Sequence, residues 1–238
     1  MKQILLFATL IFGAFAMHAT DEAEYETYRI TWSEISALVE NNPDSIKSLI
    51  DRAALGDTTL RTKELLVAYM GKSYFGASPF GESRDARSAL NEDKVDSAMV
   101  LIEQAIKRNP LSLSNNYYYV VCALTQNPQI ADYQPMQQDE NLKLAIARFN
   151  LLLEAIYYSG NGSQEYPYKV TCVDDEYTFM SQGLDLPHPT NQSLTKDGHD
   201  MFKLPAHSST RYTGLEIHFD ATRILQLEQN LFNPNSGD

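Results

Sequence analysis

The stretch AMVLIEQAIKRNP (residues 98–110) has a helical period with small residues at fixed intervals. Ala98, Ile102 and Ala105 recur at spacings of four and three, so they share one face of a helix. Small side chains on that face let a second helix approach closely, and Pro110 ends the helix. The segment therefore predicts a helix that packs tightly against another helix.

An upstream segment supplies a suitable partner. Val67, Met70, Gly71 and Tyr74 stand at offsets of zero, three, four and seven in a helix predicted over 58–74. These offsets match the first helix of a tetratricopeptide repeat (TPR), and residues 98–110 match its second helix. A regular repeat would be shorter by roughly fifteen residues, which are inserted between the two segments. We expect the two segments to form a TPR-like hairpin.

Further helices are predicted on both sides of this pair. The capping-box spacing that begins at Thr31 predicts a first helix ending near Asn41, and Pro43 opens a second one. Apolar residues with a helical period predict two more helices over 113–124 and 142–160. Helical hairpins stacked in this way leave one concave side open.

The period changes after Gly162. Alternating apolar residues predict strands over 168–173, 201–204 and 215–220, and the acidic residues from Asp174 open a short helix over 174–181. We therefore predict a mostly α protein of the α+β class. TPR-like helical hairpins over 20–162 are followed by a small mixed α/β C-terminal unit over 163–238, which packs on the helices.

The N-terminal residues 1–19 have the pattern of a secretory signal peptide. Lys2 gives a basic start, an apolar run from Ile4 to Phe15 follows, and small residues mark a cleavage site. The run is shorter than the roughly 20 apolar residues that span a bilayer, and no later stretch approaches that length. We expect an exported protein, periplasmic or secreted in a Gram-negative bacterium, with no stable membrane insertion after the signal is removed.

The charge of the chain excludes one class of partner. The formal net charge is −12, and removal of Lys2 with the signal peptide changes it to −13. Such an acidic surface repels phosphate backbones, so we expect no nucleic-acid binding. Export makes a disulfide between Cys122 and Cys172 chemically possible, but both stand in apolar contexts typical of buried free thiols. The sequence leaves these two alternatives open.

A set of short motifs links the chain to a known group of proteins. They are the TPR-like hairpin, VDDEY (173–177), Gly183, QSL (192–194), HDMFKL (199–204) and LEIHFD (215–220). With these motifs the chain resembles an exported family of unknown function from Bacteroidetes-type bacteria. The resemblance implies TPR-like helices followed by a small α/β end, and it carries no known catalytic or binding residues.

The inserted loop between the two TPR-like segments is a candidate partner site. Tyr74, Phe75 and Phe80 lie there among glycines that let the backbone expose them. Exposed aromatic side chains on a rigid scaffold often anchor a partner. The alternative is that Phe75 and Phe80 tuck under the loop as a small satellite core.

The C-terminal region holds the candidates for chemistry. His199, Asp200, Glu216 and His218 could together bind zinc or another transition metal, although they lack a recognised ligand spacing. The acidic run 174–176 could act in acid/base chemistry, but the helix dipole alone explains acidic residues in a first turn. We therefore predict no cofactor and no metal, with the four-residue set as the alternative.

Two functions of different class follow. The first is an exported protein- or peptide-binding or scaffold module, favoured by the repeat spacing and by the absence of catalytic motifs. The alternative is a hydrolase or metal-dependent enzyme that uses the His/Asp-rich C-terminal region. The sequence does not specify the ligand, the catalytic residues or the oligomeric state.

Overall fold

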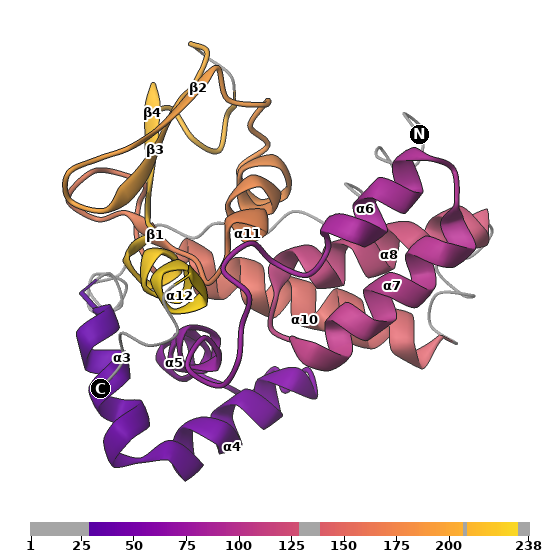
Figure 1. Cartoon of the computed structure of the whole chain (residues 1–238), viewed down its shortest axis with the longest axis horizontal. Helices are drawn as coiled ribbons and strands as arrows, with labels where there is room; N and C mark the ends of the chain where they lie inside the picture. Colours follow the sequence, from indigo (N-terminus) through magenta and orange to yellow (C-terminus); the bar gives the residue numbers. More distant parts are fainter. Residues whose placement is uncertain (1–28, 129–138, 207–208, 233–238) are drawn as a thin grey trace.

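The structure, a computed structural model, describes residues 29–128, 139–206 and 209–232. The predicted signal peptide (1–19) lies outside these residues. The N-terminal part consists of helices, which Figure 1 shows in chain order: α3 (Trp32–Asn41), α4 (Pro43–Ala54), α5 (Thr62–Lys72), α6 (Arg84–Asn91), α7 (Val95–Arg108), α8 (Leu113–Gln126) and α10 (Glu140–Tyr157). The prediction of a mostly α protein with a small α/β C-terminal part is confirmed.

Local sequence signals place several helix ends. Thr31 and Glu34 form the predicted capping box at the start of α3, and Pro43 is the first residue of α4. Ser112 caps α8, since its side chain accepts a hydrogen bond from the Asn115 amide, and Asp139 caps α10 in the same way. Each cap satisfies an amide that the helix itself leaves without an acceptor.

The pairing of helices differs from the predicted one. Helix α5 packs against α4 and α10, whereas α7 packs between α6 and α8. The predicted hairpin between 58–74 and 98–110 is therefore wrong, because the inserted residues contain α6, which becomes the neighbour of α7. The small residues Ala98 and Ala105 are completely buried, so they still let neighbouring helices approach closely.

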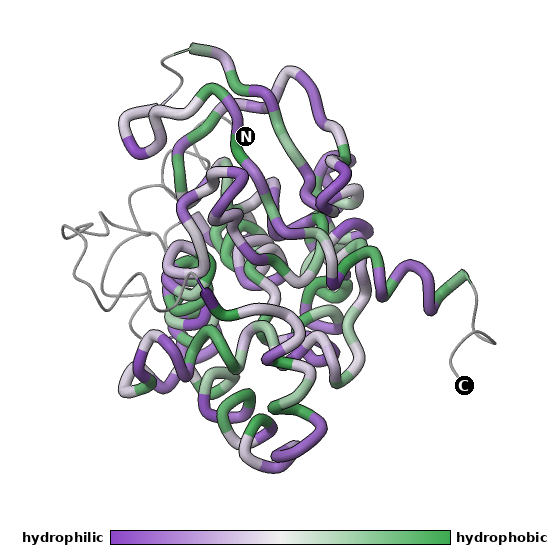
Figure 2. Tube along the Cα trace, turned by 90° about the vertical axis from the view of Figure 1, so that its left-hand side faces the viewer, coloured by the Kyte–Doolittle hydropathy of each residue, from purple (hydrophilic) through white to green (hydrophobic). Residues whose placement is uncertain are grey.

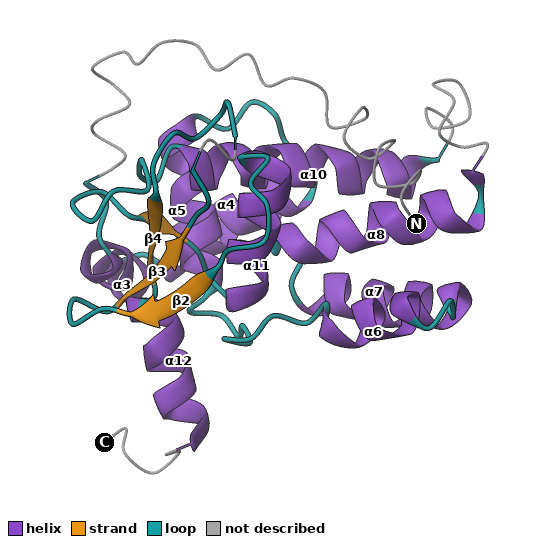
Figure 3. Ribbon diagram, turned by 90° about the horizontal axis from the view of Figure 1, so that it is seen from above, coloured by secondary structure: helices purple, strands orange, loops and turns teal. Residues whose placement is uncertain are grey.

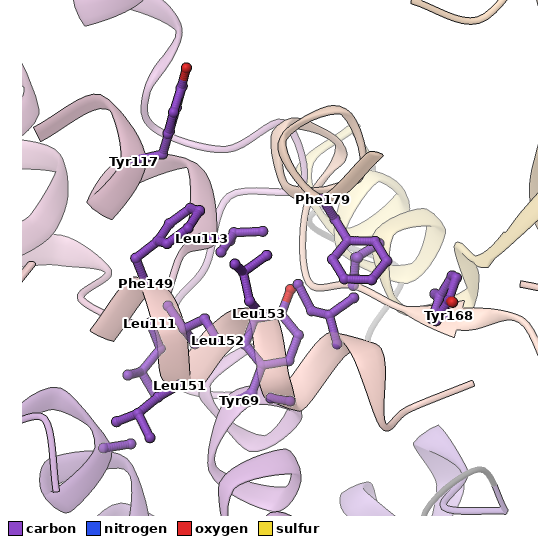
Figure 4. Packing of buried hydrophobic residues seen from close by; sticks show 14 of the residues in the cluster. Tyr69, Leu111, Leu113, Tyr117, Phe149, Leu151, Leu152, Leu153, Tyr168 and Phe179 are labelled. Atoms are coloured by element: carbon purple, nitrogen blue, oxygen red, sulfur yellow. The ribbon is translucent and has the colours of Figure 1, made fainter. Parts of the chain in front are cut away.

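One hydrophobic core runs through these helices and into the C-terminal part. Tyr69 of α5, Leu113 of α8 and Phe149 of α10 are fully buried in it, as is Phe179. Figure 4 shows these side chains converging between the helices, with Tyr117 at the edge of the cluster and its hydroxyl directed away from it. The described residues of the C-terminal part share this core and form no separate one.

The C-terminal elements form a four-stranded mixed sheet with short helices. The elements are β1 (Tyr168–Lys169), α11 (Val173–Thr178), the π-helix η2 (Phe179–Gly183), β2 (Asn191–Leu194), β3 (His199–Lys203), β4 (Glu216–Asp220) and α12 (Thr222–Phe232). The strand order is β1-β4-β3-β2, with only β1 and β4 parallel. The strand predicted over 168–173 is shorter, and the exposed polar edge strand β2 was not predicted.

The sheet has two chemically different faces. Phe202 and Phe219 are fully buried on one face, where their rings lie near Tyr177 and Phe179 of the helical segment 173–183. Figure 3 shows the strands beside α11, at the end of the molecule opposite the far ends of α6, α7 and α8. The other face carries polar residues of β3 and β4.

Helix α12 packs mainly through its beginning. Ile224 is buried, and the Arg223 guanidinium donates hydrogen bonds to the Oγ and the carbonyl oxygen of Ser73 at 3.2 and 2.9 Å. Farther along, Leu231 is exposed and Phe232 is 72% exposed, and Figure 2 shows this half of the helix extending beyond the body.

Gly71 is expected to be required for contact between α4 and α5. A Cβ at this position would lie 2.7 Å from Cγ2 of the buried Ile46. We expect Gly71→Ala to destabilise the protein by about 1–3 kcal/mol, measured by urea unfolding, because overpacking forces the helices apart. Adding Ile46→Ala should make the two effects non-additive, since the second change removes the clashing methyl group. Strictly additive losses would contradict this contact.

Candidate functional site

The buried carboxylate of Asp175 joins three helices. Tyr69 Oη of α5 donates to its Oδ2 at 3.0 Å. Its Oδ1 accepts hydrogen bonds from Ser112 Oγ, Ser114 Oγ and the Ser114 amide at 3.0, 2.9 and 2.9 Å, all at the start of α8. Burial raises the pKa of Asp175, and the hydrogen bonds from Ser114 and Ser112 oppose that rise. Helix α11 is thereby held against α5 and α8.

Its neighbour Asp174 attaches the inserted loop. Ser83 Oγ donates to Asp174 Oδ2 at 2.7 Å, and the Arg87 guanidinium of α6 lies 3.4 Å from Oδ1. The Val173 amide donates to the carbonyl oxygen of Pro79 at 3.0 Å. The loop before α6, and α6 itself, are therefore fixed to the beginning of α11.

These attachments leave a groove between α6, α8 and the helical segment 173–183. It comprises two adjoining cavities of about 460 and 510 Å³, both of which are lined by Arg87, Tyr177 and Ser181. Helix α8 contributes Tyr117 and Tyr118 to the first cavity. We call this surface the tyrosine groove.

The three tyrosines supply rings and neutral hydroxyls. Burial raises the pKa of Tyr117 to about 12 and also raises the pKa of Tyr118. The pKa of Tyr177 is raised by burial and by the nearby carboxyls of Glu176 and Asp200. Phenols with raised pKa values stay protonated at neutral pH, so the groove carries neutral hydroxyls beside apolar ring faces. The Tyr177 hydroxyl donates to Gln192 Oε1 at 2.7 Å.

Two carboxyl groups meet between α11 and the sheet. Glu176 is completely buried, and no N–H or hydroxyl group of the described residues donates to its carboxyl oxygens. Burial and the adjacent carboxyl of Asp200 hold the pKa of Glu176 well above its usual value, and burial also raises the pKa of Asp200. Two such neighbours share a proton more readily than they both ionise.

The three aromatic residues predicted to bind a partner have different surroundings in the structure. Tyr74 is half-buried, donates from Oη to the Trp32 carbonyl oxygen at 3.0 Å, and lies under the guanidinium of Arg223. Phe75 is also half-buried. Phe80 is 45% exposed. The satellite-core alternative thus describes Phe75 better than Phe80, and partner binding by all three stays a prediction.

The four residues of the alternative metal set do not come together as ligands of one ion. Met201 pairs with His218 and Lys203 with Glu216 across β3 and β4, so His199, Glu216 and His218 share the outer face of the sheet. Asp200, one residue along, points to the opposite face. In the parts of the chain that the structure describes, no three His, Cys, Asp or Glu residues gather as metal ligands.

The two cysteines are buried and do not pair. Burial raises the pKa of Cys122 to about 12, and it also raises the pKa of Cys172. Neither thiol therefore has the character of a nucleophile at neutral pH.

The burial of the acidic run is the main feature that sequence reasoning missed. Asp174, Asp175 and Glu176 do lie in the first turn of α11, as the helix-dipole interpretation requires, but all three are buried. A signal for this existed in the run SLSNN (112–116), whose polar residues Ser112, Ser114, Asn115 and Asn116 are all completely buried. Polar residues gathered in an apolar segment indicate a buried hydrogen-bonded partner.

Comparison with known proteins shows the family of the chain. Residues 33–230 match the model of a family described as a domain of unknown function, DUF4919, and the chain belongs to that family. The match covers the helices and the C-terminal sheet together. Neither the curated proteins nor the solved structures contain a match. Among the described residues, no helix is long and apolar enough to cross a membrane.

Replacement of Asp175 tests whether its carboxylate holds α11 against α5 and α8. We expect Asp175→Asn to reduce the free energy of unfolding by on the order of 3 kcal/mol, because an amide cannot accept from all four donors and leaves some of them unsatisfied. Ser114→Ala removes only the Oγ donor and keeps the amide donor, so it should cost less. Equal, small losses in chemical denaturation would show that the carboxylate does not hold the helices.

The pH dependence of stability in a Glu176 variant tests whether Glu176 and Asp200 share a proton. Because the folded-state pKa is raised, the stabilising contribution of this group is complete below about pH 4.5 and is lost as the pH rises through the folded pKa. We expect Glu176→Gln to melt at a higher temperature than the parent protein at pH 8, and close to it at pH 4.

The matched control is Glu64→Gln. Glu64 forms an exposed ion pair with Arg61, and its pKa is lowered to about 2, so its replacement should leave the alkaline loss of stability in place. A melting temperature of Glu176→Gln below that of the parent protein at every pH would contradict the shared proton.

Proposed function

We propose that this chain is an exported binding module that holds an extended peptide segment of a partner protein in the tyrosine groove. The observation that carries the proposal is the continuity of the two cavities through Arg87, Tyr177 and Ser181. Binding sites for ligands are concave, mainly apolar and set with a few polar groups, as this groove is.

The dimensions suit a short stretch of extended chain. Along α8 the first cavity runs from Tyr117 to Thr125, eight residues that rise roughly 12 Å in a helix. An extended peptide advances about 3.3 Å per residue, so about four of its residues fit along this edge. The second cavity continues the path toward Leu186 and Pro189.

The chemistry suits a peptide more than a charged ligand. Arg87 lies beside Asp174, so the most prominent cation of the groove is already partnered. Tyrosine rings supply contact area for a peptide at a small cost in side-chain entropy. The acidic net charge of the chain disfavours nucleic acids.

Phe80 extends the proposed surface. Its neighbour Pro79 accepts the hydrogen bond from Val173, and Val173 lines the second cavity. We propose Phe80 as an additional contact for the same partner, with Tyr74 and Phe75 supporting the loop. The proposed location, in the periplasm or outside a Gram-negative cell, follows from the predicted signal peptide.

A blocking substitution tests the groove without removing core contacts. Ser181 is exposed and lines both cavities, so Ser181→Trp should fill the groove and leave the fold intact. Peptides selected on the parent protein from a phage library of random sequences should bind this variant at least about thirtyfold more weakly, the equivalent of a hot-spot residue.

The matched control is Ser48→Trp, which places the same side chain at an exposed position of α4 outside the groove. This variant should bind the selected peptides as the parent does, and thermal melts should show both variants folded. Equal binding by Ser181→Trp and Ser48→Trp, or failure to select any peptide, would reject the proposal.

A further inference from the structure

The outer face of the sheet brings together two imidazoles and a thioether. Met201 lies directly opposite His218 in the antiparallel pair of β3 and β4. His199 is two residues before Met201, so its side chain lies on the same face. Register alone therefore places the three side chains side by side, and the ring centres of His199 and His218 are 6.2 Å apart.

Both imidazoles have a nitrogen without a partner. Nδ1 of His199 and Nδ1 of His218 are buried and make no hydrogen bond within the described residues. Buried polar atoms are nearly always satisfied, so two such atoms on adjacent strands point to a ligand.

The spacing suits one ion between the rings. Since a bond from a metal to an imidazole nitrogen is about 2 Å long, two ring centres that share one ion lie roughly 5 to 6 Å apart, and the wider value corresponds to nearly linear coordination. The observed separation is close to this upper value. His218 is only 7% exposed, whereas His199 and Met201 are partly accessible, so an ion can reach the site from solvent.

The other side chains on this sheet face do not supply the further ligands that a harder ion needs. Asp220, opposite His199, accepts the Thr222 amide at its Oδ1, and Glu216 is exposed opposite Lys203. Zinc in a structural site takes four ligands in tetrahedral geometry. Thioether ligands instead select soft ions such as Cu(I).

We propose that His199, Met201 and His218 form a site for a soft monovalent cation, Cu(I) or its analogue Ag(I). The site is independent of the tyrosine groove, because its side chains project from the sheet face opposite to Phe202 and Tyr177. The sequence predicts no metal, and this site differs from its alternative metal set by excluding Asp200 and Glu216 and by including Met201.

Titration of the purified protein with Ag(I), followed by NMR, gives the first test. One equivalent should shift the methyl signal of Met201 and the ring signals of both histidines. Cu(I), titrated without oxygen in competition with the chelator bicinchoninate, should bind at one ion per chain and more tightly than Zn(II). Zinc that binds the same site as tightly as Cu(I) would overturn the choice of a soft ion.

Two methionine variants make the test specific. Met201→Leu conserves volume but removes the thioether, and we expect it to weaken Cu(I) binding at least about tenfold, as loss of groups around a metal typically does. Met99→Leu makes the same change at a half-buried position on α7 and should leave binding unchanged. Unaltered affinity in Met201→Leu, or no stoichiometric binding by the parent protein, would refute the site.

Discussion

The carboxylate of Asp175 is the constraint on which the rest of the structure depends. It is fully buried and accepts hydrogen bonds from Tyr69 of α5 and from the two serines that begin α8. A buried charge is tolerated only when donors surround it, so α5, α8 and α11 must meet in one arrangement. The Tyr69 hydroxyl also accepts the Thr171 amide, which extends the network to the segment after β1.

The position of α11 then determines both candidate surfaces. Because Asp175 faces α5 and α8, Asp174 faces Ser83 and Arg87, and Tyr177 one turn later faces the tyrosine groove. Glu176 faces the sheet, where it meets Asp200. Four consecutive residues of one short helix thus hold the inserted loop, the helical core, the sheet and the groove in fixed relation.

The family match over 33–230 agrees with this arrangement, since it covers the helices and the sheet as one unit. The inner sheet face is committed to the shared core through Phe202 and Phe219. The groove and the outer sheet face are two surfaces that lie outside this inner face of the sheet. One presents neutral phenols beside apolar rings, and the other presents imidazoles and a thioether, so they suit different ligands.

The sequence by itself determined α3, α4, α5, α7, α8 and α10, the capping box at Thr31, the opening proline Pro43, strands close to β3 and β4, and the mostly α class, because periodicity and capping act over a few residues. It did not predict α6, which lies in the segment expected to be a loop. Only the tertiary structure decided which helices pair. In it α6 packs against α7, and α4 packs against α5. It alone also decided that the acidic run is buried and that Met201, not Asp200, lies beside the two histidines. The physical reason is distance along the chain. Tyr69 and Asp175 are 106 residues apart, and nothing in the period of either segment specifies that they meet.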